Sequence, residues 1–310
     1  MLKENLHYFN FSKKHPEKFL DKYYIFDKKH KDLKEYISKT KEIKEFLITI
    51  KKLEDNKENS RIINKYYLKL QQALNHYSNT SEFIAFVNAC DSYLDVVKSD
   101  LKLLKEITKR YFKERTLTEI VPEEWIQAII DSHTSRKKGQ AGENKLIDVL
   151  KKNGYKLFNK KHSWQDFLKV NKAVAKFSTG KKSDFNMSRI RKNLGAKIKT
   201  SKQNKILDLI IKKNKKIFLL EAKHINTSGG EQDKQISELI EVLSLKEKNK
   251  NIHYIAFLDG YKSNLLLGKK PKIEGKLKNQ QKEINSYLRR NKKSFWVNTG
   301  GFIKLIKDLS

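Results

Sequence analysis

The segment ILDLIIKKNKKIFLLEAKH, residues 206–224, constrains the fold of this chain more than any other part of the sequence. It contains two short apolar runs, and a lysine-rich turn at Asn214 separates them. Two such runs joined by a short polar turn predict a pair of strands in a hairpin. Side chains alternate between the faces of a strand, so Glu221 and Lys223 point to one face, and Asp208 can reach that face across the pair. The sequence therefore predicts that two carboxylates and one lysine converge at the end of an apolar sheet.

This combination of side chains is typical of phosphodiester hydrolysis. Asp208 and Glu221 offer hard oxygen ligands to Mg²⁺, which binds few protein carboxylates and keeps several waters. A bound Mg²⁺ stabilises charge on a phosphate and lowers the pKa of a water. Lys223 would orient that water, help to deprotonate it, or stabilise the pentavalent phosphorus. The alternative interpretation is a pair of hydrophobic strands with ordinary charged ends, but an acid inside an apolar run is uncommon and favours catalysis.

Asp208 followed by Glu221-x-Lys223 resembles the PD-(D/E)xK nuclease superfamily, which includes many type II restriction endonucleases. The usual proline before the aspartate is replaced by Leu207, a change that the family often tolerates. Four further segments occur in an order similar to that of restriction endonucleases that cut at GATC, and they are SRKKGQAGENKLIDVL (135–150), NTSGGEQDK (226–234), IAFLDGYK (255–262) and NTGGFIKLI (298–306). The resemblance covers roughly the second half of the chain.

The resemblance implies a fold, an activity and partners. The fold would be α/β (α+β), with a restriction-endonuclease-like mixed β-sheet flanked by helices. The activity would be Mg²⁺-dependent, sequence-specific hydrolysis of double-stranded DNA that leaves 5′-phosphate and 3′-hydroxyl ends. The partners would be a second copy of the chain, because a duplex cutter with one site per chain usually acts as a symmetric dimer, and a cognate DNA methyltransferase of a prokaryotic restriction-modification system.

The resemblance also suggests two further site residues. In this superfamily, the helix before the core strands often carries an acid that faces the metal, and Glu143 is the candidate for that role. Gln235, in the helix after the motif, corresponds to a glutamine that touches the metal-bound water or DNA. The alternatives are that Glu143 complements the dipole of a helix beginning there and that Gln235 is an ordinary polar helix residue. His224 has no second histidine at ligand spacing, which argues against zinc.

The composition indicates a polyanionic partner. The 310 residues include 68 Lys and Arg against 36 Asp and Glu, a net charge of +32, and such an excess favours nucleic acid. The single cysteine, Cys90, excludes an intramolecular disulfide framework and a multi-cysteine zinc site. No run approaches the ~20 apolar residues that span a bilayer, and no secretory signal opens the chain. We therefore expect a cytoplasmic protein without a membrane partner.

Helical periodicity and motif positions predict two regions. Residues 1–130 are expected to be helical, with an apolar stripe on residues 43–53, and to serve as a scaffold, a DNA clamp or a dimerisation element. Residues 131–310 are expected to form the catalytic and DNA-recognition domain. There, residues 252–260 are predicted to form a buried strand, and the C-terminal segment a last strand, a Gly-Gly turn and a short helix. The stretch 159–200 is expected to be irregular and basic, and the stretch 261–293 is expected to be a long basic connection.

Basic and amide side chains in the second region are candidate DNA contacts. Arg and Lys can read guanine and Asn can read adenine in the major groove, although positioning on phosphates or a solvated loop would use the same residues. Asp184 competes with Asp208 as the first metal ligand, but lysines and serines surround it rather than strand residues. The candidate contacts are Arg136, Lys181, Lys182, Asn186, Arg189, Arg191, Lys192, Ser228, Arg289 and Arg290.

Two other functions remain compatible with the sequence. One is a structure-selective or non-specific repair nuclease of the same fold, which would share the chemistry of Asp208, Glu221 and Lys223. The other is a non-catalytic nucleic-acid-binding protein, in which the positive charge would act alone. The response to Mg²⁺ separates them, because binding by a non-catalytic protein should not depend on Mg²⁺.

Overall fold

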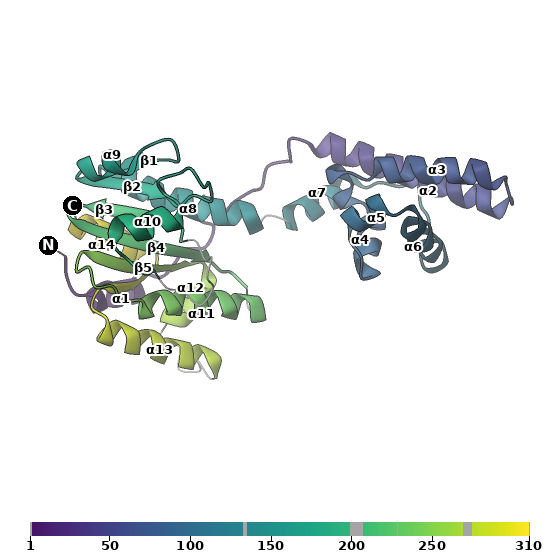
Figure 1. The fold of residues 1–310 in the computed structure, drawn as a ribbon. Helices are drawn as coiled ribbons and strands as arrows, with labels where there is room; N and C mark the ends of the chain where they lie inside the picture. Colours follow the sequence, from purple (N-terminus) through teal and green to yellow (C-terminus); the bar gives the residue numbers. More distant parts are fainter. Residues whose placement is uncertain (1, 133–134, 199–206, 228, 269–274, 310) are drawn as a thin grey trace. The chain divides into compact units, whose positions relative to one another are not determined.

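The computed structural model describes residues 2–132, 135–198, 207–227, 229–268 and 275–309. They belong to two compact units (Figure 1). One unit, residues 26–135, contains only helices and loops in its described part, and we call it the helical unit. The other combines residues 1–25 with residues 136–310 and contains a β-sheet, and we call it the sheet unit.

This division differs from the boundary between residues 130 and 131 that the sequence predicted. The first helix, α1 (Asn5–Lys14), belongs to the sheet unit. Asn5 Nδ2 donates hydrogen bonds of 2.8, 2.9 and 2.8 Å to the main-chain carbonyls of Leu288, Asn291 and Ser294. Periodicity reveals that a segment is helical but not which core it joins. The helical unit is thus an insertion between residues 25 and 136.

The helical unit has its own apolar core. Its elements are α2 (Leu33–Asp55), α3 (Ser60–Ala73), the 3₁₀ helix η1 (His76–Thr80), α4 (Glu82–Ala89), α5 (Leu94–Ser99), α6 (Leu101–Glu114) and α7 (Glu123–Ser132). The stripe predicted on residues 43–53 is confirmed in α2, where Ile43, Leu47 and Ile50 are buried against α3, α4 and α6. These contacts follow from the spacing of three to four residues, which places the side chains on one helix face.

The positive charge of the chain is concentrated in the sheet unit. The helical unit has 20 Lys and Arg against 18 Asp and Glu, a net charge of +2, and the sheet unit has 48 against 18, a net charge of +30. An excess of this size attracts polyanions over long range. The sheet unit is therefore the part that we expect to contact nucleic acid, and charge does not favour the helical unit as a DNA clamp.

The sheet is mixed, and its six described strands lie side by side in chain order. Strand β3 is antiparallel to both of its neighbours, β2 and β4. The other neighbouring pairs are parallel: β1 with β2, β4 with β5, and β5 with β6. The strand bounds are β1 (Lys156–Phe158), β2 (Lys172–Lys176), β3 (Leu209–Lys213), β4 (Lys216–His224), β5 (Ile252–Asp259) and β6 (Ser294–Val297). The predicted buried strand 252–260 is confirmed as β5, which is buried along its whole length.

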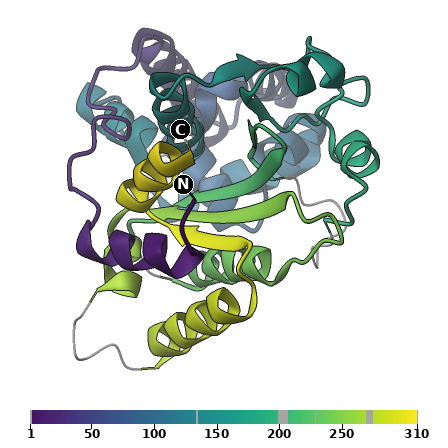
Figure 2. The same cartoon turned by 90° about the vertical axis from the view of Figure 1, so that its left-hand side faces the viewer.

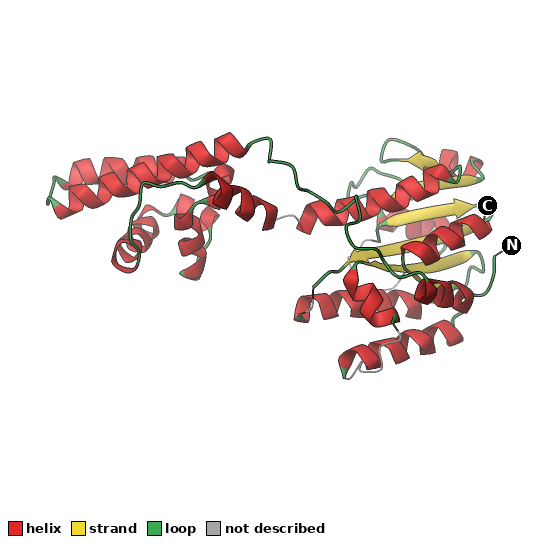
Figure 3. Cartoon of the chain, turned by 180° about the vertical axis from the view of Figure 1, so that it is seen from behind, coloured by secondary structure: helices red, strands yellow, loops and turns green. Residues whose placement is uncertain are grey.

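Helices cover both faces of this sheet (Figure 3). The helix bounds are α8 (Ser135–Lys152), α9 (Trp164–Lys169), α10 (Met187–Leu194), α11 (Gly230–Ser244), α12 (Tyr261–Leu267), α13 (Lys276–Arg290) and α14 (Thr299–Leu309). Helices α8 and α14 pack on one face, and α9 to α13 supply the clusters on the other. Helix α1 contacts β6 and contributes Tyr8 to the first face and Phe9 to the second. In Figure 2, α1 (purple) and α14 (yellow) lie side by side near β6. In the described ranges, no helix is long and apolar enough to cross a bilayer.

The predicted hairpin is confirmed as β3 and β4, with Asn214 and Lys215 as its turn. The predicted first run ended at Ile211, whereas strand β3 continues through Lys212 and Lys213. Their backbones pair with Ile217 and Lys216, an interaction that the polarity of the side chains does not reveal. The hairpin thus extends towards its turn while Asp208 stands just before its first residue.

The stretch predicted to be irregular and the stretch predicted to be a long connection both contain regular elements. Helix α9, strand β2 and helix α10 lie within residues 159–200, and helices α12 and α13 lie within residues 261–293. The apolar signal of these elements is weak. Strand β2 is the five residues KAVAK, with a lysine at each end, and α13 buries only Gln280, Ile284 and Leu288.

The glycine pair Gly300-Gly301 was predicted to form a turn, but it lies inside α14. A Cβ at Gly300 would stand 2.8 Å from His15 Cβ, and a Cβ at Gly301 would collide with Ser12 Oγ. The glycines therefore allow α1 and the residue after it to approach α14 closely. Glycine occurs both in turns, where it allows unusual backbone angles, and in helices that pack closely against another segment. A Gly-Gly pair in the sequence therefore did not distinguish a turn from a closely packed helix.

One buried histidine makes the stability of the sheet unit depend on pH. His253 of β5 stacks on Phe218 with 4.7 Å between ring centroids. Burial, with smaller contributions from Lys216 and Lys293, lowers the pKa of His253 from 6.5 to about 4. Between these values the unfolded chain binds a proton that the folded chain does not, so stability is full above 6.5 and falls as the pH drops towards 4. The difference corresponds to at most about 3 kcal/mol.

We expect His253→Phe to reduce this pH dependence, because phenylalanine keeps the stacking contact and removes the titrating group. The measurement is the free energy of unfolding in denaturant at about pH 4.5 and about pH 7.5. Phe218→Leu is the control, since it weakens the ring contact and is expected to lower stability equally at both pH values. An undiminished pH dependence in His253→Phe would contradict the prediction.

Candidate active site

Asp208 and Glu221 lie opposite one another at one end of the sheet. The strand register pairs Leu209 with Leu220, and its continuation by one residue brings Asp208 opposite Glu221. The Asp208 amide donates to the Leu220 carbonyl at 2.9 Å, and the Ala222 amide donates to Asp208 Oδ2 at 2.7 Å. The hairpin therefore brings together the two carboxylates that the sequence placed on one face.

Lys223 joins this pair from the same face of β4. Its Nζ lies 2.8 Å from Glu221 Oε1 and 3.9 Å from Glu238 Oε2 of α11. Glu221 is only 2% exposed, whereas the side chain of Lys223 is 25% exposed. Burial alone would lower the pKa of Lys223, but the charges of Glu221 and Asp208 outweigh it and raise this pKa above its ordinary value. Lys223 is thus a cation that neutralises a buried acid.

The surroundings of Asp208 disfavour the ionised form of its carboxyl group. Burial is the largest cause, and the charge of Glu221 the next, of a rise in the pKa of Asp208 from 3.8 to about 7. The Ala222 amide and Lys223 act in the opposite direction, and Glu143 adds to the rise. Two carboxylates that share a site repel unless a proton or a cation lies between them. The site therefore favours a bound cation when both acids are ionised.

Glu143 approaches this site from α8. Its Oε2 lies 2.8 Å from Lys176 Nζ at the end of β2, and its charge acts on Asp208. The helix begins at Ser135, so Glu143 lies well beyond its first turn. The helix-dipole alternative that the sequence left open requires a first-turn position and does not apply. The structure thus brings Glu143 near the carboxylate pair.

The donor atoms suit a metal ion that needs few protein ligands. In the parts of the chain that the structure describes, no three or more His, Cys, Asp or Glu side chains form a group that could hold a metal. Mg²⁺ keeps several waters and binds through one or two carboxylates, and Asp208 and Glu221 provide two. These two residues therefore fit Mg²⁺, and Glu143, already paired with Lys176, has less support as a direct ligand.

The residue of α11 with a contact to the site is Glu238, and the role proposed for Gln235 stays a prediction. Gln235 is half-buried near the start of α11, and Glu238 follows one turn later, beside Lys223. Glu238 was not predicted from the sequence. A signal for it was present in the sequence. Glu238 follows Gln235 by three residues, and residues i and i+3 lie on one helix face, so a helix that turns Gln235 to the site turns Glu238 to it as well.

The predicted DNA contacts around α10 are largely committed to local structure. Asn186 Oδ1 accepts the Arg189 amide at 2.9 Å, which caps α10, and Asn186 Nδ2 donates to the carbonyls of Lys181 and Ser183 at 3.0 and 2.8 Å. These bonds occupy the amide group that was expected to contact DNA. The side chains of Lys181, Lys182 and Lys192 are exposed and remain candidates.

The arginines of this segment are also engaged. Arg189 pairs with Asp184, and Arg191 Nη2 donates to the Ile198 carbonyl at 2.9 Å. Asp184 in addition accepts the Trp164 amide at 2.9 Å. Asp184 therefore belongs to a local network apart from the carboxylate pair, which favours Asp208 as the first metal ligand.

The remaining candidates lie elsewhere or outside the described residues. Arg289 and Arg290 are exposed at the end of α13, and Arg290 lies beside the starting residues of β5, whereas the carboxylate pair lies at the finishing end of β4. Arg290 therefore lies at the end of the strands opposite to the candidate site, and Arg289 precedes it in the same helix. The backbone of Arg136 is in α8 but its side chain, like the whole of Ser228, lies outside the described part.

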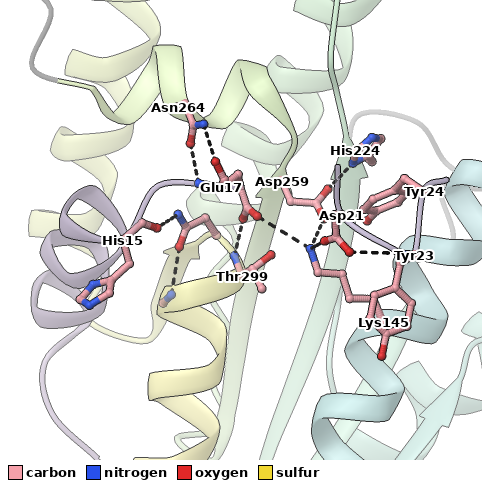
Figure 4. Close-up of polar contacts among 12 residues, drawn as sticks. His15, Glu17, Asp21, Tyr23, Tyr24, Lys145, His224, Asp259, Asn264 and Thr299 are labelled. Atoms are coloured by element: carbon pink, nitrogen blue, oxygen red, sulfur yellow. Dashed lines mark hydrogen bonds and ion pairs between the residues drawn. The ribbon is translucent and has the colours of Figure 1, made fainter. Parts of the chain in front are cut away.

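A second buried ionic cluster, drawn in Figure 4, lies near the same end of β4 and includes His224. Lys145 Nζ is 2.7 Å from Asp21 Oδ2, 2.9 Å from Asp259 Oδ2 and 3.8 Å from Glu17 Oε2, and its side chain is only 5% exposed. This cluster was not predicted from the sequence. The lysine and its three acids come from three distant parts of the chain, so no local sequence pattern predicts that they meet.

Aromatic groups complete the cluster around Asp259. The Tyr24 hydroxyl donates to Asp259 Oδ2 at 2.6 Å, His224 Nδ1 lies 2.8 Å from Asp259 Oδ1, and the rings of Tyr24 and His224 stack at 3.6 Å. Burial alone would raise the pKa of Asp259, but His224, Lys145 and Tyr24 hold this pKa below its ordinary value. Because His224 follows Lys223 on β4, the two clusters occupy opposite faces of the same strand end.

Comparisons of the chain with protein-family models, with curated proteins and with solved structures found no match. The residues and geometry of the candidate site therefore carry the functional conclusion.

Proposed function

We propose that this chain is a Mg²⁺-dependent endonuclease that hydrolyses double-stranded DNA at specific sites, in the manner of type II restriction endonucleases. The observation that carries the proposal is the buried pair of Asp208 and Glu221, with Lys223 on the same face at the end of the sheet. The mixed sheet with helices on both faces supports it, because the PD-(D/E)xK resemblance implies that architecture.

Each residue of the site has a role in this proposal. Asp208 and Glu221 would hold the metal, and Glu238 helps to place Lys223. Bound Mg²⁺ would lower the pKa of a water and neutralise charge on the phosphate. The raised pKa of Lys223 keeps it protonated, so it suits orientation of the water and stabilisation of the phosphate better than proton abstraction.

The charge of the sheet unit supports DNA as the substrate. The net charge of +30 lies on the unit that carries Asp208 and Glu221. Binding that depends on phosphate contacts weakens steeply with salt, by about 10³-fold between low and moderate salt if ~6 phosphates are contacted. The exposed lysines Lys181 and Lys182 follow β2, whose end adjoins Asp208, and are the predicted contacts best placed for this role.

The proposal includes partners that the resemblance implies. A chain with one site cleaves both strands of a duplex most simply as a symmetric dimer, so we propose a homodimer. Site-specific cleavage inside a prokaryotic cytoplasm requires protection of the host DNA, so we also propose a cognate DNA methyltransferase.

Plasmid cleavage tests this function. The purified chain is incubated with supercoiled plasmid in Mg²⁺ or in EDTA, and the products are separated and their ends sequenced. The expected result is a set of discrete fragments that form only in Mg²⁺ and carry 5′-phosphates. A Mg²⁺-dependent smear would point instead to a non-specific or repair nuclease. Intact plasmid, bound equally well with and without Mg²⁺, would indicate a non-catalytic binding protein.

A further inference from the structure

A strap formed by residues 15–25 crosses the end of the sheet and is held there by polar contacts (Figure 4). The Glu17 carboxylate accepts the Thr299 amide at 2.6 Å, and Asn264 bonds to the backbone of Glu17 at 2.7 and 2.9 Å. Further along, Asp21 pairs with Lys145 at 2.7 Å and Tyr24 donates to Asp259 at 2.6 Å. These contacts fix the strap on both sides of its middle residues.

The middle of the strap presents apolar side chains to solvent. Leu20 is 87% exposed and Phe19 is 74% exposed, the highest values among the large apolar residues that the structure describes. The ring of Phe19 lies 5.8 Å from that of Tyr261, which is itself 40% exposed. Core packing does not explain these side chains, because they bury little surface in the unit that carries them.

The backbone conformation of the strap also holds the Leu20 side chain in solvent instead of packing it against the fold. Leu20 has φ +56, in the left-handed region that residues other than glycine rarely adopt. Backbone strain of this kind persists when the surrounding structure enforces it, and here the fixed neighbours Glu17 and Asp21 do so. The fold thus maintains an unfavourable backbone conformation at a residue whose side chain points into solvent.

The exposed pair lies near the same end of β4 as the candidate active site, on the side of the strand that carries His224. Phe19 and Leu20 line a cavity of about 580 Å³ whose wall includes His224, the residue after Lys223. Lys18 and Lys22 flank the pair in the sequence, and the whole unit carries a net charge of +30. An apolar tip between two lysines on a strongly basic surface is complementary to a duplex, in which anionic backbones enclose stacked bases.

We propose that Phe19 and Leu20 form a wedge that inserts between stacked bases of duplex DNA. Apolar side chains inserted at a base step unstack it and kink the duplex, and the bent DNA then contacts more of the protein. The inference deepens the proposed function, since it rests on DNA being the ligand, but it does not depend on hydrolysis. The wedge would bend the DNA at the same end of the sheet as Asp208 and Glu221.

The test measures DNA distortion in the absence of cleavage. The full chain is bound to plasmid DNA in EDTA, unstacked thymines are detected by permanganate modification, and affinity is measured by filter binding. The native chain is expected to make discrete thymines reactive. The double variant Phe19→Ser and Leu20→Ser is expected to lose this reactivity and to bind about tenfold more weakly, the loss typical of one removed base contact.

Two further variants separate a wedge from a folding defect. Leu20→Gly removes the side chain and suits the positive φ, so it should weaken the thymine reactivity without lowering the melting temperature. Leu168→Ser, which alters a 46% exposed residue of α9 in the same unit, should change neither measurement.

Several outcomes would overturn the wedge. DNA bound by the native chain without reactive thymines, or reactivity that survives in the double variant, would do so. Loss of binding to anionic lipid vesicles in Leu20→Gly, with DNA distortion unchanged, would assign the tip to a membrane surface and also overturn it. Reactive thymines together with no cleavage in Mg²⁺ would uphold the wedge and contradict the proposed hydrolysis, so the two failures are distinguishable.

Discussion

Asp208→Asn is expected to reduce Mg²⁺-dependent cleavage of duplex DNA by at least about 10³-fold. The reason is that a metal ion contributes several kcal/mol to transition-state stabilisation, and each 1.36 kcal/mol is tenfold in rate. Asparagine keeps the size of the side chain and an oxygen for the Ala222 amide, so the hairpin should survive. The measurement is the initial rate of plasmid cleavage in Mg²⁺, with DNA affinity measured in EDTA, where we expect no loss.

Asp184→Asn is the matched control for this substitution. Asp184 is the other acid that precedes the motif, and it pairs with Arg189 away from the carboxylate pair. Its replacement should leave the cleavage rate within a few-fold of the native rate. Native-like cleavage by Asp208→Asn, or an equal loss in both variants, would remove Asp208 from the active site.

The same substitution has an opposite effect on stability. Because burial and Glu221 raise the pKa of Asp208 to about 7, the folded chain holds a proton between pH 3.8 and 7 that the unfolded chain has released. The native chain therefore loses stability as the pH rises through this window, in the absence of metal. Asp208→Asn removes that loss, so its melting temperature at about pH 8 in EDTA should exceed the native value.

Lys145→Met is expected to lower the free energy of unfolding by about 3–5 kcal/mol at neutral pH, the range observed when one partner of a buried ion pair is removed. Methionine fills a similar volume but leaves Asp259 and Asp21 without the ammonium that lies 2.9 and 2.7 Å away. The measurement is equilibrium denaturation, with the slope against denaturant compared to confirm that the unfolding transition is the same.

Lys169→Met provides the comparison at an exposed pair. Lys169 lies 3.3 Å from Asp166, and its side chain is 76% exposed. Exposed pairs contribute little, so this variant should change the unfolding free energy by less than about 0.5 kcal/mol. A loss below about 1 kcal/mol in Lys145→Met would show that the buried cluster is not a source of stability.

The parts of the fold that the sequence predicted correctly are those whose signal is local. The hairpin of β3 and β4 has long apolar runs, and strict alternation places Glu221 and Lys223 on one face. The helical stripe of α2 is equally local. Helix α13 was missed because its buried residues Ile284 and Leu288 are few and its remaining positions are mostly polar.

The parts that could not be predicted depend on distant residues. Lys145 is buried only because Glu17, Asp21 and Asp259 surround it, and a lysine in isolation is expected to be exposed. The capping role of Asn186 is different, because asparagine before a helix is a recognisable N-cap. That local signal was available, and it predicts the observed bond to the Arg189 amide better than a role in base reading.

The insertion of the helical unit between residues 25 and 136 has a consequence for the order of events during synthesis. Chains fold from the N-terminus as they emerge from the ribosome, and residues 26–135 form a contiguous unit that can fold early. Helix α1 must wait, because Asn5 bonds to Leu288, Asn291 and Ser294. The sheet unit therefore closes only after its last strand has been translated. A nascent chain would therefore carry the candidate site on an incomplete sheet until that moment.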